Sequence, residues 1–237
     1  MKYYKILRSD MTHHGFVYKE GLNVDINPFD ETPCCGGGLF FSDAENILSF
    51  VGYGDLIAEV KIPNGEQIVQ VRSKYKSHTI VLKNIKPLWN IDTLEYLIQA
   101  GIDIHVNNDY VFGCAAESGY LDIVKYLISQ GANIHADNNW AFRRAASNGH
   151  LKIVQYLKEQ DEFMDDYAFL AASENGQLDV VKYFVENGVD IHSHHDYAFR
   201  WAAHNNHLEV VKYLADNGAD IKYGTPEILE YLNSINK

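Results

Sequence analysis

The sequence predicts an α+β module at the N-terminus followed by an all-α solenoid of stacked repeats, and three observations lead to this fold class. Two linked motifs recur at a nearly fixed spacing after residue 88. Residues 1–84 contain neither motif and carry short runs of Val and Ile among many glycines. The chain has 237 residues, of which 46% are apolar and 22% charged, so it can bury a sizeable core.

Two motifs define the repeat. The first has the form LDIVKYL, and its copies start at Ile91, Leu121, Leu151, Leu178 and Leu208. These starts differ by 30, 30, 27 and 30 residues. The second motif has the form DYAFRWAA and lies 12 residues before each of the last four starts, at Asp109, Asn139, Asp166 and Asp196. One helix pair has a single apolar face that it cannot bury alone, so copies at this spacing predict a stacked solenoid.

Each repeat is expected to hold two helices. The Asp or Asn that opens the second motif is a good N-cap. Phe112, Ala115 and Ala116 follow it at spacings that place them on one face of a first helix. Gly119 then interrupts the chain, because glycine adopts the left-handed backbone of a helix end. The LDIVKYL segment from Leu121 forms the second helix, with its leucines and valine on one face.

This pattern resembles the ankyrin repeat. The segments NGHLKIVQYL at 148–157 and GADI at 218–221 are close to its consensus. The usual T-P-L-H-x-A signature of the first helix is replaced by Tyr-Ala-Phe-Arg at 197–200, and the period is 30 residues rather than about 33. With these departures, residues 88–237 are similar to the large ankyrin families of giant DNA viruses of the mimivirus type.

The register of the repeats sets the expected domain boundaries. An α+β module is expected at 1–84, a linker at 85–90 and an ankyrin-repeat solenoid at 91–237. The solenoid divides into a half repeat at 91–108, full repeats at about 109–138, 139–165, 166–195 and 196–224, and a capping helix at 225–237. Asp161 replaces a helix-ending glycine and the loop after it is three residues shorter, so a local irregularity is expected there.

The N-terminal module reads as strands at 2–9, 55–63, 66–73 and 77–85, with one helix at 42–54. Its sequence resembles the module that precedes the repeats in the same viral families. A second resemblance, to ADP-ribosyltransferases, lies in His14-Gly15, in GGGLFFSD at 36–43 and in IAEV at 57–60.

The transferase resemblance gives the module an enzymatic alternative. It implies that His14 holds the NAD ribose, that Phe41 stacks on nicotinamide and that Glu59 stabilises the developing oxocarbenium charge, while the repeats recruit the target. The module has no clear Glu motif near its end, and Phe41 replaces the commoner tyrosine. We therefore favour a module without catalytic activity.

No metal or cofactor site is expected. The adjacent Cys34 and Cys35 lack the two to four intervening residues of a zinc knuckle, so we interpret them as turn thiols, and Cys114 as a core residue. Several of the 11 histidines recur in register, which indicates a structural role. These are His105, His135 and His192 at one repeat position, and His150 and His207 at another. The sequence has no P-loop, H-E-x-x-H or nucleophile-elbow motif.

We therefore interpret the protein as a non-enzymatic scaffold for protein–protein interaction. The ankyrin resemblance implies that a partner binds the concave face and the loop tips. The candidate contact residues are Asn107, Asn108, Glu117, Asp137, Asn138, Ser147, Glu174, His194, His195 and His204.

The charge of the chain indicates the kind of partner. Residues 1–86 contain 10 basic and 10 acidic side chains, whereas residues 87–237 contain 10 basic and 22 acidic ones, so the net charge of −12 belongs to the solenoid. Nucleic acid and anionic membranes carry the same sign of charge, so a basic protein is the expected partner. The start of the chain has no apolar stretch typical of a signal peptide. We expect a monomer in the cytoplasm of the host cell.

Overall fold

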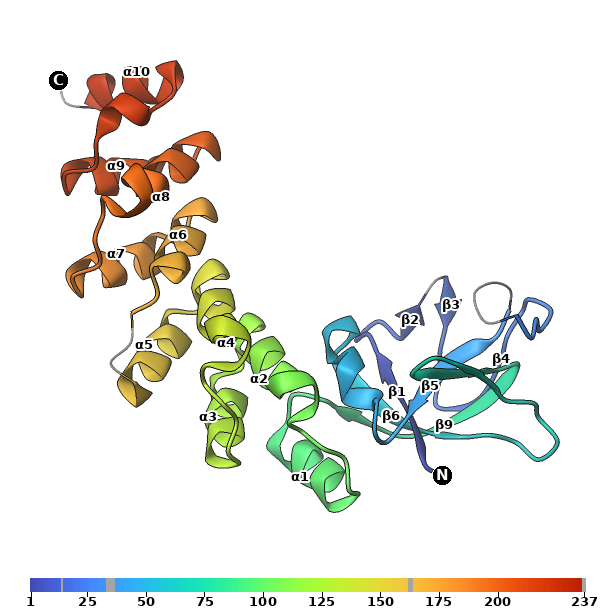
Figure 1. Cartoon of the computed structure of the whole chain (residues 1–237). Coiled ribbons are helices and arrows are strands. Elements are labelled where there is room, and N and C mark those ends of the chain that lie inside the picture. Colours follow the sequence, from blue (N-terminus) through green and yellow to red (C-terminus); the bar gives the residue numbers. More distant parts are fainter. Residues whose placement is uncertain (14, 33–36, 162–163, 236–237) are drawn as a thin grey trace. The chain divides into compact units, whose positions relative to one another are not determined.

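The computed structural model describes residues 1–13, 15–32, 37–161 and 164–235, and the chain divides into two compact units, Met1–Val111 and Phe112–Lys237 (Figure 1). The first unit contains an antiparallel sheet and the second a series of paired helices. The fold class predicted from the sequence is therefore confirmed. His14, Cys34 and Cys35 lie outside the described residues.

A seven-stranded antiparallel sheet forms most of the first unit, in the order β4-β9-β6-β1-β5-β8-β7. Its strands are β1 (Tyr3–Leu7), β4 (Gly21–Val24), β5 (Leu39–Asp43), β6 (Leu56–Lys61), β7 (Val69–Val71), β8 (Lys74–Ser77) and β9 (Thr79–Pro87). A separate pair joins β2 (Thr12–His13) to β3 (Phe16–Val17). The four expected strands correspond to β1, β6, β7 and β9.

The sheet continues beyond the expected end of the module. Strand β9 runs to Pro87, and the backbone N–H of Leu88 donates to the carbonyl of Asp55 at 2.7 Å. Residues 85–87, which the sequence places in a linker, therefore extend a strand. Helix α1 (Ile91–Gln99) belongs to the same compact unit as the sheet. Its Tyr96 hydroxyl donates to the Glu59 carboxylate of β6, and this bond raises the pKa of Tyr96 to about 12.

The two faces of the sheet have different functions in packing. Tyr4 lies opposite both Glu59 and Ser42 in the strand register, so these three side chains share one face. Their neighbours point to the other face, where the apolar core is formed by residues that include Leu7, Phe41, Ala58, Val60, Tyr75, Ile80 and Leu82.

The expected helix at 42–54 is wrong in its start. Ser42 and Asp43 end strand β5, and the helix is a 3-10 helix, η1 (Ile47–Tyr53). The Asp43 carboxylate accepts hydrogen bonds from the backbone N–H of Asn46 at 3.0 Å and from the Tyr75 hydroxyl at 3.0 Å. Strand pairing and these two bonds hold Asp43 in the sheet, so the helix begins later than its sequence pattern predicts.

Lys5 is a lysine buried in the core of the first unit. It is 4% exposed, its Nζ donates to the Phe40 carbonyl at 2.5 Å, and it lies 4.4 Å from the centre of the Tyr18 ring. Burial, with a smaller contribution from the nearby Lys74 charge, lowers the pKa of Lys5 to about 7. The sequence KYYKIL gives no sign of this, because lysine at an alternate strand position usually faces water.

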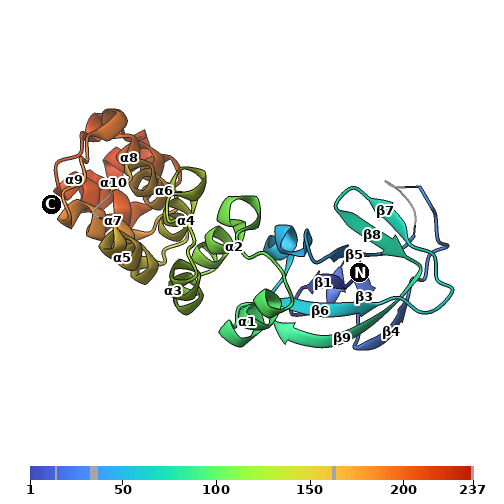
Figure 2. The same cartoon turned by 60° about the horizontal axis from the view of Figure 1, so that its bottom comes forward.

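The second unit consists of helix pairs. Its helices are α2 (Val106–Glu117), which begins in the first unit, α3 (Leu121–Ser129), α4 (Ala136–Ser147), α5 (Leu151–Gln160), α6 (Asp166–Glu174), α7 (Leu178–Glu186), α8 (Ser193–His204), α9 (Leu208–Asp216), η2 (Ile221–Tyr223) and α10 (Pro226–Ile235). The first helices α4, α6 and α8 form one row and the second helices α5, α7 and α9 the other (Figure 2). The capping helix begins where expected, with Thr225 preceding Pro226.

The predicted apolar faces form the core between the rows. Phe112, Phe169 and Phe199 are almost completely buried, as are the alanines Ala115, Ala116, Ala172, Ala202 and Ala203. Cys114 is also buried, as expected. Alanine lets the first helices approach closely, and they contact one another more extensively than the second helices do. The free side of the first helices is therefore the inner side of the curve of this array.

Left-handed backbone recurs at helix ends and in loops of the repeats. Gly119, Gly149 and Gly176 end first helices with φ values between +72° and +84°, and Asn206 does so at +59°, which confirms the expected helix ends. Three loops contain a turn of three consecutive left-handed residues, at 107–109, 137–139 and 194–196. The left-handed conformation costs free energy in residues other than glycine, although Asn, Asp and His adopt it more readily than most.

Histidines close these left-handed turns. Nδ1 of His105, His135 and His192 lies 2.6, 2.7 and 2.8 Å from the Oδ1 atom four residues later, on Asp109, Asn139 and Asp196. The recurring histidines are therefore structural, as expected. The acidic or amide residues have a different role from the expected N-cap, because their left-handed backbone differs from the extended backbone of an N-cap.

The third full repeat has a different helix start. Its loop is three residues shorter, and Asp165, one residue before the expected position, is the N-cap of α6. The Asp165 side chain accepts hydrogen bonds from the backbone N–H groups of Tyr167 and Ala168, and its other oxygen accepts one from Arg143 Nε at 2.7 Å. Asp165 thus joins two successive first helices in a loop whose described residues contain no left-handed turn.

We predict that Lys5→Met stabilises the first unit at pH 7 and removes a pH dependence. The folded pKa of Lys5, about 7, is below its unfolded value, so the unfolded chain binds the extra proton between these values. The free energy of unfolding of the wild type should therefore rise from pH 7 to pH 9.5, on the order of 1–3 kcal/mol. Urea titrations of the whole chain, monitored by the NMR signals of residues 1–87, measure this free energy at each pH.

The exposed Lys2→Met variant is the matched control, because it makes the same substitution at an exposed lysine just before the same strand. It should keep the rise in stability between pH 7 and 9.5. An identical rise in the Lys5→Met protein would contradict the assignment of this pH dependence to the buried ammonium group.

Candidate functional site

The inner surface of the array is the candidate site. We define it by the side chains that the first helices leave uncovered by the second helices, namely Glu117, Trp140, Arg143, Arg144, Ser147, Tyr167, Ala171, Glu174, Tyr197, Arg200, Trp201 and His204. All of them are exposed or half-buried. Tryptophan, tyrosine and arginine predominate, and these residue types contribute most of the binding energy in protein interfaces.

Aromatic side chains link successive repeats on the inner surface. Tyr167 at the start of α6 lies over Arg143 of α4, with the guanidinium 4.7 Å from the ring centre. Tyr223 lies over Arg200 of α8 in the same way at 5.6 Å. Trp140 covers Gly113 of α2 so closely that a Cβ on this glycine would lie 1.8 Å from the indole ring. Trp140 and Tyr167, which share one repeat position, thus each pack on the preceding repeat.

The turns between the two helices of a repeat are tied to the preceding repeat. His150 Nε2 lies 2.9 Å from the carbonyl oxygen of Glu117, and His207 Nε2 lies 2.9 Å from that of Glu174. Both carbonyls belong to the last turn of a first helix, where backbone acceptors lack partners within the helix. These bonds tie the backbone that carries Glu117 and Glu174 to the next repeat.

The candidate residues at the helix ends have separate environments. Arg144 forms an ion pair with Glu117 at 3.5 Å, and the Asn175 side-chain amide donates to Ser147 Oγ at 3.0 Å. Glu174 and His204 are exposed. The structure therefore places all four predicted helix-end residues on the inner surface. Of the two carboxylates among them, that of Glu117 already forms an ion pair within this chain.

The candidate residues at the loop tips lie in the left-handed turns. Asn107, in the first unit, donates from its side-chain amide to Ser49 Oγ at 2.9 Å. His194 contacts Ser193 Oγ through Nδ1 at 2.7 Å, and its ring lies 5.5 Å from that of Tyr167. The remaining loop-tip candidates, which are Asn108, Asp137, Asn138 and His195, are exposed.

The structure does not bring the transferase candidates together. Phe41 and Glu59 lie on opposite faces of the sheet: Phe41 contacts Tyr3 and Tyr75 in the core, with ring centres 5.0 and 6.0 Å away, and Glu59 contacts Tyr96. His14 lies outside the described residues.

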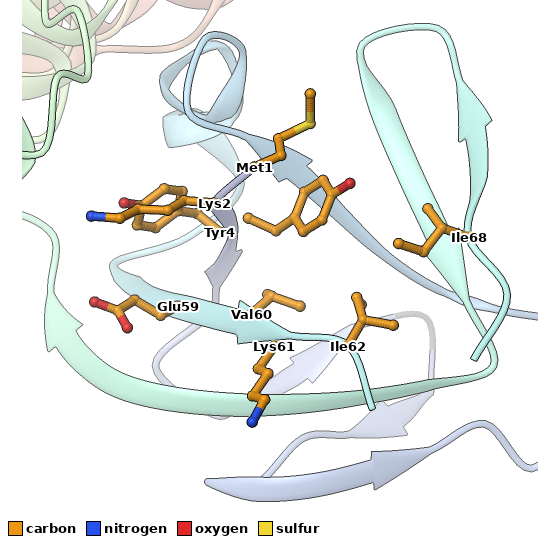
Figure 3. Close-up of a pocket in the computed structure, with 9 residues that line it drawn as sticks. Met1, Lys2, Tyr4, Glu59, Val60, Lys61, Ile62 and Ile68 are labelled. Carbon is orange, nitrogen blue, oxygen red and sulfur yellow. The ribbon is translucent and has the colours of Figure 1, made fainter. Parts of the chain in front are cut away.

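A pocket of about 430 Å³ lies beside β1 and β6 (Figure 3). It is lined by Met1, Lys2, Tyr3, Tyr4, Glu59, Val60, Lys61, Ile62 and Ile68. Glu59 is thus at a pocket that Phe41 does not line. In the described ranges, no group of three or more His, Cys, Asp or Glu side chains is arranged to hold a metal ion.

Sequence reasoning missed the arginines and tryptophans of the inner surface. The candidate contact residues named from the sequence do not include Trp140, Arg143, Arg144, Arg200 or Trp201. The available signal was variation: at the position held by Arg144, other repeats carry Cys114, Ala171 and Trp201. A residue that changes at a fixed place in a repeat is free of the packing constraint.

Comparisons with known proteins identify the repeat. A family model of ankyrin repeats, three copies long, matches residues 87–166 and 142–225. Protein R869 of Acanthamoeba polyphaga mimivirus is 32% identical over 127 residues, which are 51% of this chain and 92% of that protein. Ankyrin repeat protein R896 of the same virus is 34% identical over 50% of this chain and 38% of its own length, and R868 is 32% identical over 51% and 63%.

This chain therefore spans much less than the full length of two of these three relatives. Ankyrin repeats form protein–protein interaction domains, and the family is generally non-enzymatic. Among the described residues, no helix is long and apolar enough to cross a membrane.

We predict that Gly113→Ala destabilises the array by about 1–3 kcal/mol, because the added methyl group collides with the Trp140 ring and a well-packed contact must open. Urea denaturation of the whole chain, followed by tryptophan fluorescence, measures the loss. The double variant Gly113→Ala with Trp140→Ala is the control. Removal of the ring should make the added methyl group nearly neutral relative to Trp140→Ala alone, and equal effects of Gly113→Ala in both backgrounds would refute the contact.

Proposed function

We propose that this chain, which belongs to the ankyrin-repeat family, binds a partner protein through the inner surface of its array and the adjoining loop tips. The observation that supports this best is the composition of the inner surface, where exposed or half-buried Trp, Tyr and Arg side chains lie on a row of packed helices. The first helices are fixed by buried alanines and by bonds between repeats, so their exposed side chains are ordered before a partner arrives. Such preorganisation reduces the entropic cost of binding.

The charge of the repeats supports a partner with a basic surface. The excess of 12 acidic side chains in residues 87–237 creates a negative field that attracts a positively charged protein and speeds its association. The exposed Glu174 and Asp137 carry this charge to the proposed contact region. We further propose that the chain acts as a monomer. Because the relatives are proteins of a virus of Acanthamoeba polyphaga, we place it in the host cytoplasm.

We predict that Glu174→Arg abolishes partner capture while Glu186→Arg retains it. Both residues are exposed and acidic and lie near the end of a helix in the same repeat, one on α6 and one on α7. Both variants change the net charge equally, so only the position of the change differs. The whole chain is immobilised, incubated with Acanthamoeba lysate at low and high salt, and the bound proteins are identified by mass spectrometry.

The expected result is one set of basic proteins that the wild type and Glu186→Arg recover, that Glu174→Arg loses, and that high salt releases. Recovery of the same proteins by both variants would show that the inner surface does not mediate the interaction.

A further inference from the structure

The second full repeat contains a cation that is held by its own chain. The Arg144 guanidinium lies 3.5 Å from the carboxylate of Glu117, at the end of the preceding first helix, and 5.8 Å from the centre of the Trp140 ring. One arginine on the inner surface thus contacts both an aromatic ring and a carboxylate. This arrangement combines a cation–π contact with an ion pair.

The same framework recurs at the fourth full repeat. Residues there lie 57 positions later in the sequence, so Tyr197 corresponds to Trp140, Trp201 to Arg144 and Glu174 to Glu117. The connection between repeats is preserved as well. His207 Nε2 contacts the Glu174 carbonyl at 2.9 Å, the distance that His150 keeps from the Glu117 carbonyl. The Asn205 side-chain amide adds a second bond to the Glu174 carbonyl at 3.1 Å.

The cation itself is missing from this second framework. Trp201 occupies the place of Arg144, and its ring lies 5.5 Å from Tyr197 and 5.4 Å from His204. Within the described residues, the Glu174 carboxylate forms no ion pair, and no lysine or arginine lies over the rings of Tyr197 and Trp201.

We propose that Tyr197, Trp201 and Glu174 form a binding site for an arginine side chain of the partner protein. Arginine fits better than lysine because its planar guanidinium stacks on an aromatic ring and matches a carboxylate with two parallel hydrogen bonds. This proposal rests on the proposed function, because it assigns one anchor of the basic partner to the inner surface. It gives the acidic repeats a specific contact in addition to long-range attraction.

An NMR titration tests the site without the natural partner. The chain has three tryptophans, and their indole N–H signals report on Trp89, Trp140 and Trp201 separately. The probe is a pentapeptide of five arginines, compared with the same peptide made of citrulline, which keeps the shape and lacks the charge. The arginine peptide should shift the Trp201 signal, while the Trp140 signal, whose site holds Arg144, stays unchanged.

Variants of matched charge sharpen the result. Glu174→Gln should weaken peptide binding at Trp201 roughly three- to tenfold, because the ion pair is lost and the stacking contact remains. Glu117→Gln, the equivalent change two repeats earlier along the array in the occupied framework, should leave binding at Trp201 unchanged. Arg144→Ala should open the occupied framework, so that the Trp140 signal now shifts as well.

Equal shifts with the citrulline peptide, or equal binding by Glu174→Gln and wild type, would overturn the arginine site. Loss of capture in Glu174→Arg together with no Trp201 shift would leave the proposed function intact and reject this inference alone. A Trp201 shift together with no partner captured by the wild type would support the arginine site and reject the proposed function.

Discussion

The structure depends on one constraint: a single helix pair cannot bury its own apolar face. Each repeat therefore needs a neighbour, and the contacts between neighbours include buried phenylalanines and alanines and, at two interfaces, a bond from a histidine side chain to a backbone carbonyl of the preceding repeat. Because the buried residues recur in register, the helices keep one register along the array. The side chains that do not take part in stacking are free to differ between repeats, and they gather on the inner surface.

Because the stacking residues recur, equivalent positions on the inner surface of different repeats can be compared with one another. Glu117 and Glu174 are held by equivalent histidines at equal distances, so their surroundings can be compared directly. A difference that bears on charge is Arg144 in one repeat and Trp201 in the other. In a protein without repeats, the same chain would offer no equivalent carboxylate with which Glu174 could be compared. Here the chain itself shows which group such a pair can hold.

The parts of the structure that follow from local pattern could be predicted from the sequence. Helix faces, glycine helix ends, the capping helix and the structural histidines all repeat in register, so each prediction is supported several times. Lys5 and the start of η1 could not be predicted, because burial and strand pairing in the sheet depend on contacts distant in sequence. The inner surface was predicted only in part. Its polar helix-end residues were expected, whereas its arginines and tryptophans were not among the candidate contacts.

The left-handed turns show how the repeat length is allowed to vary. Loops that contain such a turn give a period of 30 residues, and the loop before α6, whose described residues contain none, gives 27. Three residues of left-handed backbone therefore behave as a removable unit. Asp165 takes over the helix start when the unit is absent, and the aromatic contact of Tyr167 with the preceding repeat is kept. Insertions and deletions in steps of three at this point would let such arrays change the reach of their loops during evolution while the helical core stays in place.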